Sequence, residues 1–344
     1  MDGQSLATLS NLVLYGAMGV YAFTMIAFAV HLAFAAGRAS RRAGGEQAAV
    51  AEQRVAAGVG GRGDAGEVGS PTARSAQRSS DAAERASLGA RAGGWAMSLG
   101  WLGTLLLGAS IALRGASVQR APVSNMFEFA CAAAFLVMLI YLVLAMRRPL
   151  RWLGLFVVTP VLLALGLAIT VWYTEASELV PSLKSTWLVI HVPVAILSTA
   201  IFTISFCVLL LHLAQARREA RKAAGLPVRF DNFLAALPTA ASLDRTAYGL
   251  VVVAFPLWTF TLIAGAIWGQ QAWGTYWSWD PKEVWTFVIW VIYAAYLHAR
   301  ATSNWSLRTA NIIAVVGYLA IIVNFTIVNM YFPGMHSYSG LVTP

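Results

Sequence analysis

The sequence predicts an all-α polytopic integral membrane protein with about eight transmembrane helices. Hydrophobic residues make up 58% of the 344 residues and charged residues 11%, and the mean hydropathy is +0.66. A soluble domain carries about 25% charged residues. Several apolar runs are about 20 residues long, which is enough to cross ~30 Å of hydrocarbon. These runs must be helical, because the bilayer core offers no water to satisfy backbone groups.

The expected spans are 11–35, 95–113, 123–146, 151–173, 188–213, 247–267, 285–300 and 310–330. The first run follows a polar N-terminus without basic residues, so we expect a retained span and not a cleaved signal peptide. The seventh run is short for a span. We expect it either to extend into the tryptophan-rich stretch before it or to lie in thinned bilayer.

The basic residues predict the orientation. If the sides alternate, all but four of the 24 Lys and Arg residues lie at or beside loops 36–94, 147–150, 214–246 and 301–309; the exceptions are Arg114, Arg120, Lys184 and Lys282. Because basic loops stay in the cytoplasm, both termini and the loops around 114–122, 174–187 and 268–284 are expected outside. This asymmetry explains the net charge of +9, so no nucleic-acid partner is expected.

We divide the chain into a first span (1–36), a cytoplasmic insertion (37–93) and a membrane domain (94–344). The insertion is rich in Ala, Gly, Arg and Ser and almost free of large apolar residues, so we expect it to be disordered. Cys131 and Cys207 lie inside apolar runs and form no CxxC motif. Neither a disulfide framework nor a thiol-exchange motif is therefore expected.

Tryptophans are concentrated in one predicted outer stretch, 268–285, which has the sequence WGQQAWGTYWSWDPKEVW. The five that it contains are Trp268, Trp273, Trp277, Trp279 and Trp285. An interfacial aromatic belt explains one or two tryptophans at a span end. Five, interleaved with glycines that allow close backbone approach, favour a surface for a large planar apolar ligand.

The end of this stretch has the pattern of a helix start. Asp280 is a good N-cap, Pro281 suits the first helical position, and Glu283 completes a capping box. Lys282 lies at the same helix start. It is either a solvated charge or the partner of a ligand carboxylate such as a heme propionate.

Two of the five histidines, His191 and His336, lie at the predicted outer ends of spans five and eight. Imidazole is a common axial ligand of heme iron, so we predict that this pair binds one heme beside the tryptophans. His298 lies deeper in span seven, in the cytoplasmic half of the bilayer, and is a candidate ligand of a second, transmembrane heme. A packed, structural histidine is the alternative for each.

The tryptophan string, with His191 before it and His298 and His336 after it, resembles the heme-handling proteins that carry a tryptophan-rich "WWD" domain. Among these it is similar to the CcsA/ResC family of system II cytochrome c biogenesis, whose actinobacterial-type members are often named CcsB. The resemblance covers about residues 95–340, and APVSNMFEF (Ala121–Phe129) also resembles a motif of the family. The insertion 37–93 departs from the compact family pattern.

The resemblance implies a function in a bacterial plasma membrane, with the heme site on the outer face. Such proteins move reduced heme b outward and present it to CXXCH segments of c-type apocytochromes, where two thioethers form. His191 and His336 match the family's external ligands, and His298 matches its transmembrane ligand. The partner of that third ligand lies on a ResB/CcsB-like subunit. A thiol-reducing protein takes part indirectly. Asp280, Lys282 and the tryptophans of the segment are then candidate heme contacts, and no residue is singled out as catalytic.

Three other functions remain open from the sequence, one of which is a transporter that uses the tryptophans as a plain aromatic belt. The chain could deliver or chaperone heme without attaching it, as shorter relatives with the same tryptophan motif do. It could also be an electron-transfer subunit with bis-histidine b-type hemes. That class places paired histidines on facing helices at equal depth within the bilayer, whereas the best pair here lies at the outer rim.

Overall fold

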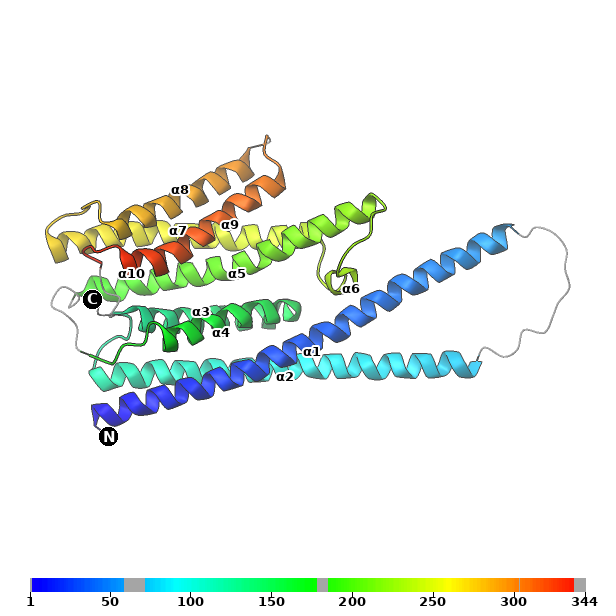
Figure 1. The fold of residues 1–344 in the computed structure, drawn as a ribbon, viewed down its shortest axis with the longest axis horizontal. Coiled ribbons are helices and arrows are strands. Elements are labelled where there is room, and N and C mark those ends of the chain that lie inside the picture. The colour runs from blue at the N-terminus through cyan, green and yellow to red at the C-terminus, as the bar shows by residue number, and fades with distance from the viewer. Residues whose placement is uncertain (1, 59–71, 178–184, 303, 337–344) are drawn as a thin grey trace.

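The computed structural model describes residues 2–58, 72–177, 185–302 and 304–336, which form a bundle of long helices (Figure 1). In chain order its elements are α1 (Gly3–Gly58), α2 (Thr72–Val118), α3 (Met126–Arg147), the 3-10 turn η1 (Arg151–Leu153), α4 (Gly154–Thr170), α5 (Thr186–Ala223), α6 (Asp231–Leu234), α7 (Ala240–Trp273), α8 (Pro281–Ala301), α9 (Leu307–Val323), the π-helical turn η3 (Asn324–Val328) and α10 (Asn329–Tyr331).

The prediction of eight spans is confirmed. Among the described residues, eight helical segments are long and apolar enough to cross a membrane. They run back and forth, so that α1 begins and α10 ends at the same end of the bundle (Figure 1). We call this the pocket end; the loops 119–125 and 274–280 also lie there. Which side of the membrane it faces stays a prediction.

Hydrogen bonds from small polar side chains join neighbouring helices. The Ser10 and Ser110 hydroxyls each donate to the other's backbone carbonyl at 2.8 Å, which joins α1 to α2. The Ser198 hydroxyl donates to the Ala254 carbonyl at 2.8 Å, which joins α5 to α7. Small residues and interhelical hydrogen bonds stabilise helix packing where surrounding lipid is as apolar as the helices.

The insertion 37–93 differs from the expected disorder. Its described parts are helical, because α1 continues to Gly58 and α2 begins at Thr72; residues 59–71 lie outside the described residues. The physical reason is the high alanine content of these flanks, since alanine has the strongest helix propensity. Low apolar content limits burial in a core, but it does not prevent a helix from continuing out of a span.

The tryptophan stretch 268–285 is not one loop. Helix α7 continues to Trp273 and ends at Gly274, whose φ of 78° is the left-handed C-cap conformation that glycine favours. Helix α8 begins at Pro281, and both hydrogen bonds of the predicted capping box between Asp280 and Glu283 are present. The stretch therefore consists of a helix end, a short loop and a helix start. Span seven extends outward to Pro281, one of the two expected solutions to its short length.

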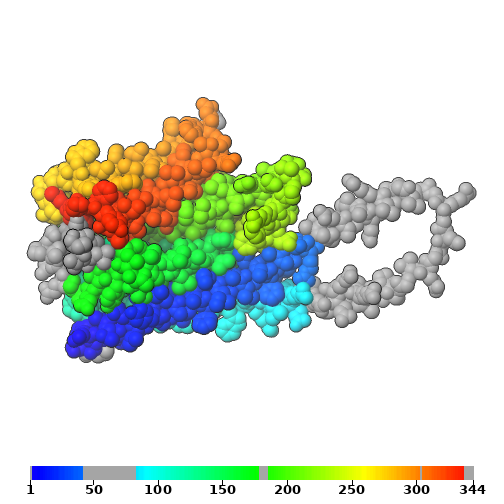
Figure 2. Space-filling model, in the orientation of Figure 1, coloured from blue at the N-terminus to red at the C-terminus, as the bar shows by residue number. Residues whose placement is uncertain are grey.

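Span eight contains an irregular turn that the sequence did not indicate. Helix α9 passes into the π-helical turn η3 and then into α10, so the span covers Leu307–Tyr331. Single π-turns inside α-helices often occur at functional sites. In the space-filling view, the C-terminal segment (red) lies against the yellow end of α7 at the pocket end (Figure 2). This arrangement brings η3 beside the tryptophan stretch.

Candidate functional site

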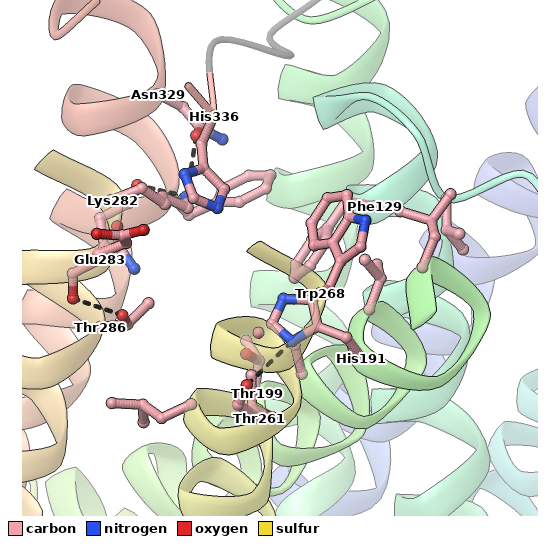
Figure 3. Close-up of a pocket in the computed structure, with 18 of the residues that line it drawn as sticks. Phe129, His191, Thr199, Thr261, Trp268, Lys282, Glu283, Thr286, Asn329 and His336 are labelled. Carbon is pink, nitrogen blue, oxygen red and sulfur yellow. Dashed lines mark hydrogen bonds between the residues drawn. The ribbon is translucent and has the colours of Figure 1, made fainter. Parts of the chain in front are cut away.

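A pocket at the pocket end of the bundle collects residues from α3, α5, α7, α8, η3 and the chain end (Figure 3). Much of its wall is aromatic or aliphatic, including Phe129, Trp258, Trp268, Trp277, Leu188 and Ile321. A few polar side chains reach it among these, and both His191 and His336 line it. Apolar walls with a few placed polar groups are typical of binding sites for small molecules and cofactors.

His191 lies in the first turns of α5 and packs closely against α7. Its Nδ1 is 3.0 Å from the backbone carbonyl oxygen of Thr261. A carbonyl oxygen only accepts, so Nδ1 carries the proton and donates it. A Cβ at Gly265 would lie 2.8 Å from His191 Cε1, so this close approach of the ring to α7 requires a glycine. The Nε2 of the neutral imidazole thus keeps its lone pair.

His336 follows α10 and is held by the N-cap of α8. Its Nδ1 is 2.9 Å from Asp280 Oδ2, and the Met335 backbone N–H donates to Asp280 Oδ1 at 2.6 Å. The same carboxylate accepts the Lys282 backbone N–H at 3.0 Å. Burial raises the pKa of Asp280, but the hydrogen bonds from His336, Met335 and Lys282 lower it more, so the net pKa lies below its usual value. The anionic carboxylate accepts a hydrogen bond from His336 Nδ1–H, so in the neutral imidazole the lone pair lies on Nε2.

Trp268 lies beside both histidine rings. Its ring centroid is 5.7 Å from that of His191 and 6.3 Å from that of His336. The residue is 3% exposed, and its Nε1 donor has no hydrogen-bond partner among the described residues. A buried N–H without a partner costs free energy, so each such group calls for an explanation, and a bound water or ligand atom is one. Trp268 is therefore a pocket residue with an unused donor.

The other tryptophans of the stretch have different surroundings. Trp277 lines the pocket, whereas Trp273 lies behind the wall with its ring 4.8 Å from that of His336. Trp279 is 76% exposed, has a φ of 60° and is absent from the lining. Trp285 packs against the apolar core and is also absent from the lining. The structure thus brings Trp268 and Trp277 to the pocket, and not Trp279 or Trp285.

Lys282 is not a solvated charge. It is partly buried and lines the pocket, and its ammonium donates to the Asn324 carbonyl at 3.0 Å and to Asn329 Oδ1 at 2.9 Å. Asn324 also lines the pocket and is 4% exposed, and its Oδ1 has no hydrogen-bond partner among the described residues. Sequence reasoning missed Asn324 and Asn329, because NFTIVN looks like ordinary span sequence and carries no motif.

His298 is far from the pocket. It lies 17 residues after Pro281 in α8, about 26 Å along the helix at 1.5 Å per residue, and its side chain is exposed on the outside of the bundle. The other two histidines, His31 and His212, donate from Nδ1 to the carbonyls of Gly89 and Ala240 at 2.7 and 2.9 Å. His298 is thus set apart by its exposure.

A buried ionic cluster supports the pocket wall that precedes α3. The Glu128 carboxylate accepts from Arg114 Nε at 2.9 Å and from Arg120 Nη1 at 2.8 Å. The Glu128 side chain is 0% exposed, and those of Arg114 and Arg120 are 5% and 8% exposed. The two arginines also donate to the carbonyls of Thr174 and Ser177. The cluster joins loop 119–125 to the start of α3 and to the segment after α4.

Together, the fold and this pocket define a class: a polytopic membrane protein with a paired-imidazole, tryptophan-walled pocket at one end of the bundle. A family model described as "Cytochrome C assembly protein" matches residues 122–336. The chain belongs to that family. The match includes His191, the tryptophan stretch, His298 and His336, and it excludes α1 and α2.

Relatives named "Cytochrome c biogenesis protein CcsA" agree with this assignment. The chain is 34% identical to that of Synechococcus sp. (strain CC9902) over 253 residues, which cover 68% of this chain and 83% of the relative. It is 39% identical to the Chlamydomonas reinhardtii protein over 164 residues and 37% identical to the Guillardia theta protein over 176 residues; each match covers 48% of this chain. These matches cover 44% and 58% of the two relatives, so the chain spans about half their length.

Proposed function

We propose that this chain is the heme-binding subunit of a system II cytochrome c synthase, with His191 and His336 as the axial ligands of one heme b. The observation that carries the proposal is that the two imidazoles have the same hydrogen-bonding arrangement. Each uses Nδ1 in a hydrogen bond to an acceptor, each lines the same pocket, and neither Nε2 has a hydrogen-bond partner within the described part of the chain. Metal-binding histidines typically have this arrangement, because the second hydrogen bond fixes the tautomer and the ring orientation.

The pocket's other residues fit a flat apolar ligand. Trp268 and Trp277 supply broad apolar faces, and Phe129 adds a third ring. The unpartnered Nε1 of Trp268 supplies a donor for a polar edge. Heme is the cargo of this site, and membership in the cytochrome c assembly protein family supports that identification.

The chemistry needs positioning more than acid–base groups. At each position a cysteine thiol of the CXXCH segment adds across a heme vinyl group. A C–S bond forms, the S–H bond breaks, and the proton goes to the terminal vinyl carbon, so no net oxidation or reduction occurs. Holding the reactants in place supplies the main rate advantage of such a site. Two imidazoles exclude dioxygen from the iron until the CXXCH histidine displaces one of them.

His298 serves a second, transmembrane heme in this proposal, with a ligand from a ResB/CcsB-like subunit. Its exposed side chain supports this assignment, since no described residue of this chain covers it. Phe287, Val291 and Ala295 are exposed on the same side of α8, at spacings of three or four residues that place them on one face. That face is where the partner subunit would pack. The protein would then act in the bacterial plasma membrane, with the pocket end outside.

Co-expression tests the function. The full chain is produced with a ResB/CcsB-like subunit and a CXXCH reporter, and covalent heme on the reporter is measured. His191→Ala and His336→Ala should abolish the covalent product and the bis-histidine absorption spectrum, and added imidazole should restore part of the spectrum. Glycine variants at the same two positions would also leave room for added imidazole.

The same experiment separates the rival functions. Bound heme that never reaches the reporter, with the partner present, would favour a chaperone. A heme that is retained and cycles between redox states would favour an electron-transfer subunit. Normal maturation in both alanine variants would overturn the assignment of the ligands.

A further inference from the structure

One wall of the pocket is polar and has no role yet in the proposed heme site, unlike the two histidines and the tryptophans. Lys282 from α8 meets Asn324 and Asn329 from the irregular end of span eight there. Lys282 and Asn329 are labelled in Figure 3. We propose that this group is a carboxylate-binding subsite that holds the propionate groups of heme and so selects porphyrins with free carboxylates. The inference rests on the proposed function, because it gives this wall a role within the same heme pocket.

The Lys282 ammonium is held in place by neutral acceptors only. It donates to the Asn324 carbonyl and to Asn329 Oδ1 at 3.0 and 2.9 Å, and it forms no ion pair with a carboxylate among the described residues. An ammonium has three donors, so one remains for a ligand. A partly buried cation without an anion within hydrogen-bond distance is costly unless a bound anion completes its surroundings. A carboxylate in the pocket would do so.

The π-helical turn η3 supplies the second observation. Asn324 is the first residue of η3, and the Asn324 backbone carbonyl accepts a hydrogen bond from the Lys282 ammonium. The Asn324 side chain is 4% exposed, faces the pocket and has an Oδ1 without a hydrogen-bond partner in the described chain. Among the residues that the structure describes, the Asn324 Nδ2 group has no hydrogen-bond partner either, so its N–H donors also remain for a ligand oxygen. Lys282 and Asn324 thus offer donors from two different helices to one point.

Two carboxylates lie near Lys282 in the sequence, and both already accept several hydrogen bonds. Asp280 accepts from His336 Nδ1 and from the backbone N–H groups of Lys282 and Met335. Glu283, which lines the pocket, accepts from the Ser278 and Asp280 backbone N–H groups. Both also lie at the N-terminus of α8, where the helix dipole stabilises negative charge. The Lys282 ammonium is therefore the charged group on this wall that still has a free donor.

The apolar wall opposite Lys282 restricts how a bound porphyrin can be oriented in the pocket. Figure 3 shows Lys282, Glu283 and Thr286 on one side of the space and His191, Trp268 and Phe129 on the other. A porphyrin with both ring faces apolar and two carboxylates on one edge would place that edge at Lys282. The vinyl groups, which lie away from the propionates on the ring, would then be directed away from Lys282. The subsite thereby sets the orientation that thioether formation needs.

The test compares two ligands of the same chain. The purified full-length protein is titrated with heme b and with heme b dimethyl ester, which lacks the carboxylate charges. The parent should bind heme b more tightly by about tenfold or more, as expected for one charge-assisted hydrogen bond. In Lys282→Met the ratio should fall to about one, and Lys282→Arg should recover most of it. Lys222→Met, the same substitution in an exposed ion pair at the other end of the bundle, should keep the parent ratio.

The bis-histidine absorption spectrum separates failure of this inference from failure of the proposed function. If the parent shows no such spectrum with either ligand, the proposed ligands themselves are wrong. If Lys282→Met keeps the spectrum and also keeps the parent's preference for heme b, the carboxylate subsite is wrong. Equal affinity of the parent for the acid and the ester would also overturn it. Should Lys282→Met not fold, Lys282→Arg decides: a preference for heme b that stays at the parent value supports the subsite, and a preference lost entirely contradicts it.

Discussion

At the scale of single residues, the two pocket histidines differ in the acceptor behind them. His336 donates to the Asp280 carboxylate, whereas His191 donates to the Thr261 backbone carbonyl. A carboxylate behind an imidazole raises the basicity of the ligating nitrogen more than a neutral carbonyl does. In the proposed heme site, His336 is therefore the electronically stronger ligand of the two. His191 is the one whose position is fixed by helix packing.

Asp280→Asn tests this difference. Asparagine is also a good N-cap, so α8 should keep its start while His336 loses its anionic acceptor. We expect heme affinity to fall by roughly 10–100-fold, the usual cost of losing such an outer partner, with little change in thermal unfolding. Heme titration and thermal unfolding of the same sample measure both effects. Asp280→Ala should lower both, and an unchanged affinity in Asp280→Asn would contradict the role of the carboxylate.

Gly265→Ala tests the close approach of His191 to α7. The added Cβ would lie 2.8 Å from His191 Cε1, so the ring must move and the bis-histidine spectrum should weaken. Gly249 provides a matched control in the same helix, because a Cβ there would meet nothing within 4 Å. Gly249→Ala should leave heme binding unchanged and stabilise α7 by about 0.5–1 kcal/mol. If both variants bind heme alike, the close contact at Gly265 is unimportant.

The sequence predicted the paired histidines but not all of their surroundings. Depth along a span is readable from sequence, and this was enough to select His191 and His336. The direction of a loop side chain is not, because it depends on backbone angles. The φ of 60° at Trp279 accompanies a ring that is 76% exposed, while Trp277, two residues earlier, lines the pocket. Both look equivalent in the sequence.

At the scale of secondary-structure elements, a local signal predicted the start of α8, whereas no local signal indicated the π-turn. The capping box at Asp280 is confirmed, because capping depends on residues within one turn. The turn η3 has the sequence NFTIV, which an α-helix accepts equally well. Its conformation accompanies contacts with Lys282, which lies 42 residues earlier in the sequence. Such long-range causes leave no local pattern.

The buried ionic cluster gives an element-scale prediction. In Glu128→Gln, Arg114 and Arg120 lose the carboxylate that they share, at a buried site. Breaking a buried pair in this way costs about 3–5 kcal/mol of unfolding free energy. Loop 119–125, which lines the pocket at Val123 and Ser124, should loosen as well, so heme affinity should fall. Denaturant unfolding in detergent and heme titration provide the measurements.

The control for Glu128→Gln is the ion pair between Asp231 and Arg218 beside α6. Asp231 has a side chain 35% exposed, and such pairs contribute at most about 1 kcal/mol. Asp231→Asn should therefore have a small effect on unfolding and none on heme binding. Equal losses in the two variants would show that burial of the Glu128 cluster does not matter.

At the scale of the whole molecule, the proposed function assigns two separate heme sites to opposite ends of one helix. Lys282 at the start of α8 lines the pocket, and His298 near the end of α8 is exposed on the bundle's outer surface. Composition predicted the eight spans, and their alternation put the three histidines at these depths. The exposure of His298 required the packing of the whole bundle, because each helix buries only one face.

This arrangement predicts that His298→Ala has an effect only in the complex. Alone, the chain should bind the same amount of heme with or without His298, because His298 lies about 26 Å along α8 from the start of that helix at the pocket. With a ResB/CcsB-like subunit present, the parent complex should gain a second heme, and His298→Ala should lose it while keeping the pocket heme. Heme content per chain and the absorption spectrum of each purified sample measure this difference.

Val291→Ala, on the same exposed face, is the control for packing without ligation, and it should leave the second heme in place. A second heme that persists in His298→Ala would show that another residue binds it, and partner-independent loss of heme would place His298 in the folding of the bundle instead.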